Sequence, residues 1–348
     1  MYFYWLMLAL FSTGALLWQR RQEHSAVRLG FYFSIVLAML MVGLRWQIGP
    51  DWETYSFIYN SASQITFDQV LQRHDPGFYL LAWTLDSNHA PFWMLNLVMA
   101  AILCFGLAAF CRRLPNPWLA VTVAVPYLII VVGMNLIRQA AAMGFVFLAF
   151  QNVGSKPLWK SLGWALVASL FHASAIIVAF LIGVSYTKSR ITAALLMVIF
   201  AVPAYYILFS TFDDYFQRYG HQLIDSGGVY FRLVINAIPA VLLFVFKKRG
   251  IVPKDEYVLW RNIALLSLLL LPVPLFIRST TSVDRASMYA IPLQLLVLSS
   301  FPRTVSITSA RSVNTAAIVL YSAITLLTYF SFGTHARYFV PYRSIFSS

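Results

Sequence analysis

The chain alternates long apolar runs with short polar stretches. The runs are Tyr2–Trp18, Leu29–Trp46, Pro91–Phe110, Trp118–Gly133, Leu136–Gln151, Leu158–Phe171, Ala173–Tyr186, Ile191–Phe209, Val229–Phe246, Tyr257–Ile277, Ala286–Phe301 and Val313–Phe330. A helix that crosses a membrane needs about 20 apolar residues. The pattern therefore predicts an all-α, polytopic integral membrane protein with about 12 transmembrane helices, some of them short or kinked.

Residues 118–186 can be threaded in two ways, as four short segments or as two long spans. Basic loops mark the cytoplasmic side of a polytopic protein. With the N-terminus outside and four segments, every lysine of the chain falls on the inner side. Merging Leu158–Tyr186 into one span would move four basic residues to the opposite side from the other basic loops: Lys188, Arg190, Arg303 and Arg311. The charges favour the four-segment interpretation.

The composition agrees with a chain that lies almost wholly in or near lipid. Of its 348 residues, 60% are hydrophobic and 11% are charged, and the mean hydropathy is +0.73. These values exclude a water-soluble enzyme, a secreted disulfide scaffold and a disordered binder. The net charge of +13 then reflects the distribution of basic residues between the two sides of the membrane rather than nucleic-acid binding.

Cys104 and Cys111 share one apolar run and are expected to be packing residues. With no internal repeat or linker, we expect one domain over residues 1–348.

Three outer segments are longer than a turn requires: residues 47–90, 210–230 and 278–285. Long connections carry function more often than short ones. In the first, Trp52, Tyr55 and Tyr59 alternate with acidic residues. This pattern predicts amphipathic helices at the membrane–water boundary that cap a cavity, with these rings lining its vestibule.

The outer side holds arginines but no lysine. A guanidinium binds phosphate oxygens through two parallel hydrogen bonds, so the bias favours a cavity that handles a phosphate or pyrophosphate. Simple pairing of these arginines with the outer acids stays open. Arg138 lies between apolar runs, where an unpaired charge is costly, and we expect it to share a helix face with Asn135. Arg278 and Arg285 are the other candidates, with Asp284 able to neutralise one of them.

Asp51, Asp75 and His172 are the candidate groups for proton transfer. Asp51 and Asp75 each precede a predicted helix, so each has the alternative role of N-cap. His172 lies between short apolar segments and has the alternative of a buried structural histidine. The sequence contains no metal-binding motif and no nucleotide-binding motif, and we expect no metal and no cofactor.

The sequence resembles the EpsG family of bacterial polysaccharide polymerases, a Wzy-like group. The resemblance covers about residues 40–186 and rests on Arg45-x3-Gly49-x-Asp51-Trp52-x2-Tyr55, Asp75-Pro76-Gly77-Phe78-Tyr79, Arg138-Gln139 and Phe171-His172-x-Ser174-Ala175. It implies a GT-C-like, metal-independent glycosyltransferase in the bacterial cytoplasmic membrane. Such an enzyme polymerises undecaprenyl-pyrophosphate-linked oligosaccharide repeat units, of O-antigen or exopolysaccharide, at the outer face. A chain-length regulator is a candidate partner, and nucleic acid is not.

The resemblance also implies roles for individual side chains. The pyrophosphate would contact Arg138, Arg278 and Arg285, and Gln139 would be a further substrate-binding residue. Asp51 or His172 would be the base, while Asp75, Arg45, Trp52 and Tyr55 would shape the acceptor side. Three other functions stay open. These are a lipid-linked oligosaccharide flippase or transporter, a membrane acyltransferase that modifies the glycan, and a structural membrane component.

Overall fold

The computed structural model describes residues 1–18, 25–151, 153–154, 157–187, 228–276 and 280–347, together with positions 191 and 195. Within these ranges the regular secondary structure is helical, apart from an isolated bridge between Arg45 and Ser344. The expected span Ile191–Phe209, most of the second outer loop and Arg278 lie outside the described residues. The principal helices are α1 (Tyr2–Trp18), α2 (Ser25–Gly43), α3 (Trp52–Asn60), α4 (Phe67–Leu71), α5 (Pro76–Ser87), α6 (Phe92–Cys111), α7 (Pro117–Ala124), α8 (Gly133–Asn135), α9 (Ile137–Gln151), α10 (Leu158–Phe171), α11 (Ile176–Tyr186), α13 (Val229–Val245), α14 (Tyr257–Leu269), α15 (Thr281–Ser287), α16 (Ile291–Ser300) and α17 (Thr308–Phe332).

Several of these helices suit a membrane. In the described chain, five stretches are long and apolar enough to cross one: Ser25–Gly43, Phe92–Cys111, Pro117–Asn135, Tyr257–Leu275 and Thr308–Phe332. Shorter apolar helices accompany them, including α1, α9, α10 and α13. The fold is thus all-α and compatible with a polytopic membrane protein, whereas the number of about 12 spans stays a prediction.

The centre of the bundle is formed where α6 and α9 meet. An added Cβ on Gly106 would lie 2.0 Å from the carbonyl oxygen of Gly144, and one on Gly144 would lie 2.3 Å from that of Ile102. Small residues let helix backbones approach closely in the absence of a hydrophobic driving force. Cys104 and Cys111 lie buried on α6 as free thiols. They are packing residues, as expected.

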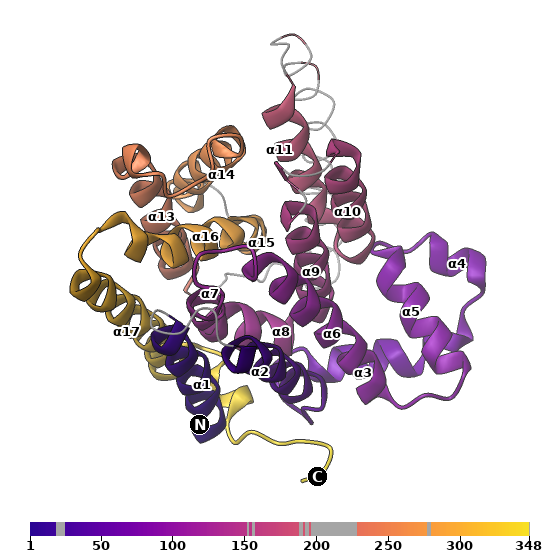
Figure 1. Cartoon of the computed structure of the whole chain (residues 1–348). Coiled ribbons are helices and arrows are strands. Elements are labelled where there is room, and N and C mark those ends of the chain that lie inside the picture. Colours follow the sequence, from indigo (N-terminus) through magenta and orange to yellow (C-terminus); the bar gives the residue numbers. More distant parts are fainter. Residues whose placement is uncertain are drawn as a thin grey trace.

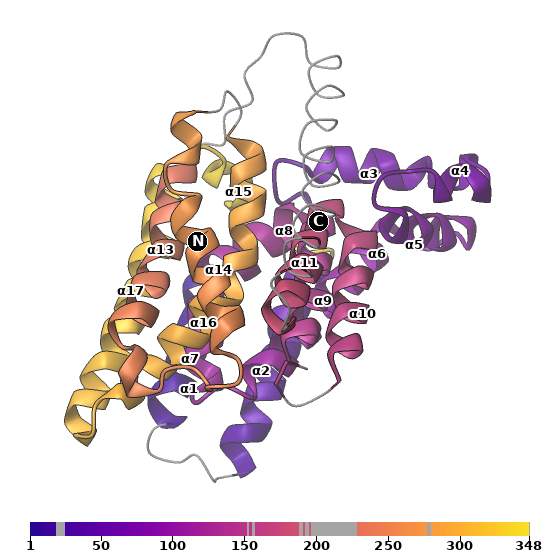
Figure 2. The same ribbon diagram turned by 90° about the horizontal axis from the view of Figure 1, so that it is seen from above.

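The four-segment interpretation of residues 118–186 matches the helices observed. The first segment continues from α7 through a π-helical stretch, Val125–Val132, into α8. Pro126 has no N–H to donate and disturbs the regular helical ladder at this point. The chain then breaks at Leu136 and at His172, α9 ends at Gln151 and α10 begins at Leu158, and α10 and α11 lie side by side (Figures 1 and 2).

The helices of the first outer loop project from one end of the bundle. In Figure 1 α4 and α5 extend to one side of the molecule, and in Figure 2 α3, α4 and α5 run across the direction of the bundle helices. We call α3, α4 and α5 the arm. Phe57, Phe67 and Leu71 are exposed on it, which fits helices that lie at a membrane boundary.

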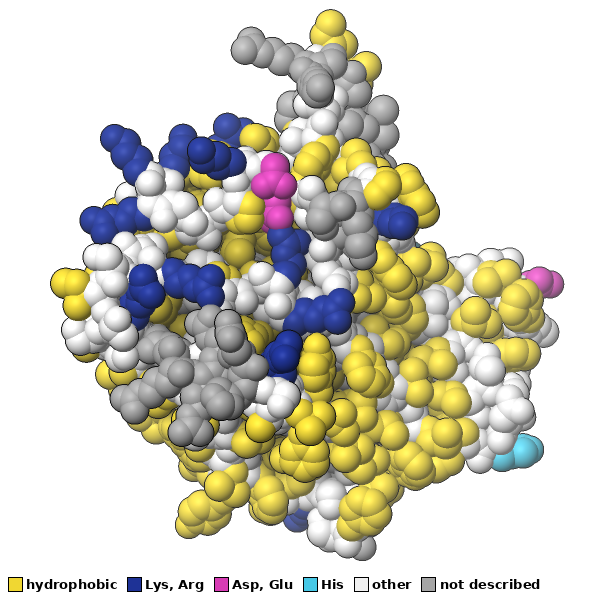
Figure 3. Space-filling model, in the orientation of Figure 1, with side chains coloured by type: hydrophobic (Ala, Val, Ile, Leu, Met, Phe, Trp, Pro, Cys, Tyr) yellow, Lys and Arg dark blue, Asp and Glu magenta, His cyan; other side chains and the backbone are white. Residues whose placement is uncertain are grey.

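Lysines and arginines gather on the face shown in Figure 3, which we call the basic face. Arg113 pairs there with Glu256, Arg303 donates to the Pro115 carbonyl and Arg249 to that of Thr304. The arm lies at the opposite end, which we call the arm end. The N-terminal helix and the C-terminal segment meet each other there, since the Tyr4 hydroxyl donates to the Phe339 carbonyl.

Candidate functional site

Asp75 stands at the start of α5, in a left-handed backbone conformation with φ 62°. It occupies the N-cap position, but its carboxylate makes no capping hydrogen bond. Instead, Oδ2 accepts from Nη1 of Arg138 at 2.9 Å and Oδ1 accepts from the Ala173 amide at 2.8 Å. Nδ1 of His172 lies 3.6 Å from Oδ2, beyond hydrogen-bonding distance. One buried carboxylate therefore joins the starts of α5 and α9 to the turn between α10 and α11.

Arg138 lies in the first turn of α9, directly after the break at Leu136. Its guanidinium carbon is 5.7 Å from the ring centroid of Tyr55 and 5.6 Å from that of Phe78. These distances are typical of cation–π contacts. The arginine side chain nevertheless stays 28% exposed, so part of its positive charge is accessible from outside the cluster. Asn135 belongs to α8, and the break at Leu136 separates it from Arg138. The expectation that the two share one helix face is wrong.

Asp51 occupies the N-cap position of α3 and likewise makes no side-chain capping bond. Its backbone amide donates to Oδ1 of Asn135 at 2.9 Å. Gly49, with φ 96°, makes this contact possible, because an added Cβ would lie 2.8 Å from the Met134 carbonyl oxygen. The turn before α3 is thus pressed against the end of α8, and the Asp51 carboxylate faces a cavity.

This cavity has a volume of ≈ 370 Å³ and lies between α8, α13, α15, α17 and the turn at Asp51. Asp51, Arg285 and His335 are among the residues that line it. Arg285 makes no ion pair with a described residue. Asp284 does not neutralise it, because both carboxylate oxygens of Asp284 accept from Arg232, at 2.5 and 2.9 Å.

Arg232 and His335 are members of this cavity that the sequence reasoning missed. Arg232 lies inside the apolar run Val229–Phe246, and a charged residue in such a run is a recognisable sign of function or pairing. Nothing in the sequence around His335 marks it, because it reaches the cavity through the packing of the segment after α17.

The two candidate carboxylates have different electrostatics. Burial raises the pKa of Asp51, and the positive charges of Arg285 and His335 only partly oppose that effect. Burial would also raise the pKa of Asp75, but His172, Arg138 and the Ala173 amide outweigh it and lower that pKa. Asp51 is therefore the better proton acceptor, whereas Asp75 is held as a fixed anion.

The remaining predicted residues lie around this cluster or apart from it. Gln139 donates to the Arg285 carbonyl at 3.0 Å and so connects α9 to α15. Arg45 is buried, donates to the Val42 carbonyl and to Asn96, and lies 5.5 Å from the ring centroid of Trp52.

The aromatic residues predicted to line a vestibule lie apart from this cavity, and Trp52 lines a separate hollow of ≈ 660 Å³ together with Trp46 and Phe92. Trp52 packs against Arg45 and Phe92, and the Tyr59 hydroxyl donates to the Ala90 carbonyl inside the arm. Tyr55 contacts Arg138 through its ring, and none of these three side chains lines the cavity. The three aromatic residues are spaced i, i+3 and i+7, so they share one face of α3, and that face is buried. Among the described residues, no group of three or more His, Cys, Asp or Glu side chains could hold a metal ion.

The family model described as the EpsG family matches residues 2–344. The chain belongs to the EpsG family. This membership indicates a membrane protein with a polysaccharide polymerase-like function in polysaccharide biosynthesis. No curated protein and no solved structure matches the chain.

The segments by which the sequence resembles the EpsG family are brought together in space. The segments at Asp75, Arg138 and His172 meet directly through the contacts of Asp75. The segment at Asp51 reaches the same end of the bundle through Asn135. Arg45 is buried and ties the end of α2 to α6 through Asn96, and its backbone pairs with Ser344 of the C-terminal segment.

Proposed function

We propose that this EpsG-family protein is a glycosyltransferase that joins lipid-linked oligosaccharide repeat units. The donor is a growing glycan on undecaprenyl pyrophosphate, and the acceptor is a hydroxyl of the next unit. The observation that supports the proposal is the convergence of Asp51, Arg285, Asp75 and Arg138 at one end of a helical bundle, next to an open cavity.

The proposed reaction needs one base and a stabilised leaving group. The acceptor hydroxyl gives its proton to the Asp51 carboxylate while its oxygen attacks the anomeric carbon of the donor sugar. The bond between that carbon and the diphosphate oxygen breaks, and the electron pair leaves with the lipid diphosphate. Asp51 suits the base role because burial raises its pKa and because its side chain is not used as a helix cap.

Arginines suit the leaving group, whose negative charge grows as the bond breaks. Arg285 lines the cavity without an ion pair to a described residue, and the partly exposed Arg138 lies on the neighbouring helix α9. Positioned charges of this kind typically contribute a factor of about 10² to 10³ in rate. Arg278 belongs to the same proposal from its place in the sequence.

Asp75 and His172 receive different roles in this proposal. Asp75 is a positioning residue, because its carboxylate is fully engaged with Arg138 and Ala173. His172 is a second candidate base, since neither ring nitrogen has a hydrogen-bond partner in the described chain.

The site faces the periplasm or exterior of a bacterial cytoplasmic membrane, as supported by the basic face at the opposite end.

The experiment that tests the function uses purified protein and one defined undecaprenyl-pyrophosphate-linked repeat unit, without nucleotide or metal. We expect a ladder of glycans longer than one unit, together with released undecaprenyl pyrophosphate. Transfer of single units across a vesicle membrane without joining would instead show a flippase. Acyl groups added from a cytoplasmic donor would show an acyltransferase. Either result would overturn the proposal.

A further inference from the structure

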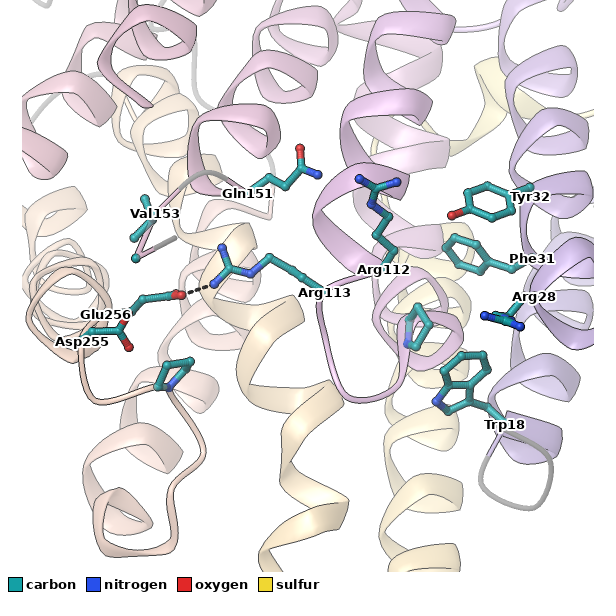
Figure 4. Close-up of a pocket in the computed structure, with 13 residues that line it drawn as sticks. Trp18, Arg28, Phe31, Tyr32, Arg112, Arg113, Gln151, Val153, Asp255 and Glu256 are labelled. Atoms are coloured by element: carbon teal, nitrogen blue, oxygen red, sulfur yellow. Dashed lines mark hydrogen bonds and ion pairs between the residues drawn. The ribbon is translucent and has the colours of Figure 1, made fainter. Parts of the chain in front are cut away.

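A second hollow opens on the basic face, far from the cavity at the arm end. It has a volume of ≈ 670 Å³ and lies between α2, the end of α6 and the segment before α14. Figure 4 shows its lining side chains, with Arg28 and Tyr32 on one side and Asp255 and Glu256 on the other. The proposed glycosyl transfer makes no use of this hollow.

One wall of the hollow is held in place by an internal network. Arg113 donates to the Glu256 carboxylate and, at 2.6 Å, to the Phe150 carbonyl. The other carboxylate oxygen of Glu256 accepts from the indole N–H of Trp260 at 2.8 Å. The charge of Glu256 is therefore already compensated, and Arg113 is fixed at the edge of the space.

Two further arginines are available to a ligand. Arg28 on α2 and Arg112 at the end of α6 both line the hollow and are exposed. Neither side chain makes a hydrogen bond or an ion pair with a described residue. Asp255 is the other acid in the lining. Three guanidinium groups thus face two carboxylates, one of which is bound, and the hollow favours an anion.

The same hollow has an apolar side, and α2, which contributes to it, also carries exposed apolar residues. Trp18, Phe31 and Tyr32 line it, and the Trp18 indole is fixed by a hydrogen bond to the Pro115 carbonyl at 3.0 Å. On the outer surface of α2, Leu29 is 73% exposed and Phe33 is 68% exposed. A ligand with an anionic head and a hydrocarbon tail would satisfy both surfaces.

We propose that this hollow binds the phosphate group of an anionic phospholipid. Arg28 and Arg112 contact the phosphate oxygens, and the acyl chains run along the exposed apolar face of α2. A soluble phosphate compound would use the same arginines but would gain nothing from that apolar face. Basic pockets between transmembrane helices are a recurring way of holding anionic lipid head groups.

The test uses the full chain in nanodiscs of equal parts phosphatidylglycerol and phosphatidylcholine, with retained lipid measured by native mass spectrometry. Arg28→Gln/Arg112→Gln removes both arginines. Lys248→Gln/Lys254→Gln removes the same charge from the basic face without touching the hollow. We expect retained phosphatidylglycerol to fall roughly 25-fold in the first variant, at about fivefold per arginine, and to stay unchanged in the second. Equal retention in both variants, or equal loss, would overturn the proposal.

Two further arms complete the test. Arg28→Gln alone changes one exposed side chain, so it should fold and lower retention by about fivefold. Inorganic pyrophosphate is also titrated into protein held in phosphatidylcholine nanodiscs, where we expect no binding that depends on Arg28 and Arg112. Such binding would show that the hollow takes a soluble phosphate compound, and the assignment to a lipid would be wrong.

Discussion

The pair formed by Arg138 and Asp75 allows a test that separates stability from chemistry. Arg138→Gln leaves the Asp75 carboxylate buried with only the Ala173 amide as donor. Asp75→Asn leaves the guanidinium of Arg138 without its anion. In Arg138→Gln/Asp75→Asn both groups are neutral and can still form a hydrogen bond. We expect the double variant to be more stable than the sum of the single effects predicts, yet inactive.

The magnitudes follow from the geometry of the pair. A hydrogen bond to a charged group contributes about 1.5–3 kcal/mol, and breaking a fully buried ion pair costs about 3–5 kcal/mol. The Arg138 side chain is 28% exposed and that of Asp75 is 6% exposed, so water partly screens the pair. Each single variant should lose about 2–3 kcal/mol, with a coupling free energy between the two sites of about 1–2 kcal/mol.

Two measurements are needed. Denaturant unfolding in micelles gives the free energy of unfolding of the wild type, both single variants and the double variant. Polymerisation of a defined lipid-linked repeat unit, followed by gel separation of the products, gives activity at equal protein levels. Activity should fall about 10²-fold or more in every variant that lacks Arg138. Glycans of normal length from the double variant would refute a role for Arg138 beyond pairing with Asp75.

Three further predictions concern the cavity at the arm end. Initial polymerisation rates should fall as pH drops through the raised pKa of Asp51, because the protonated carboxyl cannot accept a proton. Arg285→Gln removes a positive charge that lowers the pKa of Asp51, so the loss of rate at low pH should begin at a higher pH. An unchanged pH dependence in this variant would exclude Asp51 as the base. Gly49→Ala should lower stability by about 1–3 kcal/mol and reduce the rate, whereas Gly163→Ala, which has open space around it, should do neither in thermal unfolding and rate assays. Excess EDTA should leave the rate unchanged, because arginines rather than a metal ion offset the diphosphate charge, and loss of activity restored by a divalent cation would contradict this.

The fold was predictable where hydrophobicity alone decides it. The apolar runs and the described helices agree closely, and charge placement selected the broken path through residues 118–186. The helices after Arg278 were harder to predict. The run Ala286–Phe301 merges parts of α15 and α16, because local hydropathy does not show where a helix tightens into a 3-10 turn at Met288–Ala290.

The sequence allowed the residues of the candidate site to be chosen, but it did not show which of them contact one another. Arg138 and His172 were chosen because polar groups between apolar runs are costly, and Asp51 and Asp75 because they are acids in the long first outer loop. The pairing of Arg138 with Asp75 joins positions far apart in the chain, and spacing rules act only over a few residues. The resemblance to the EpsG family placed Arg45 on the acceptor side, and the structure shows that its side chain is buried.

The attachment of the arm at Asp75 has a mechanical consequence. The carboxylate that begins α5 is also bound to α9 and to the turn before α11, so the arm cannot tilt without displacing Arg138. If the arm rests on the lipid surface, a change in bilayer thickness or tension that tilts the arm would displace Asp75 and Arg138. Under the proposed function, we expect the thickness of the surrounding membrane to influence the rate at which repeat units are joined.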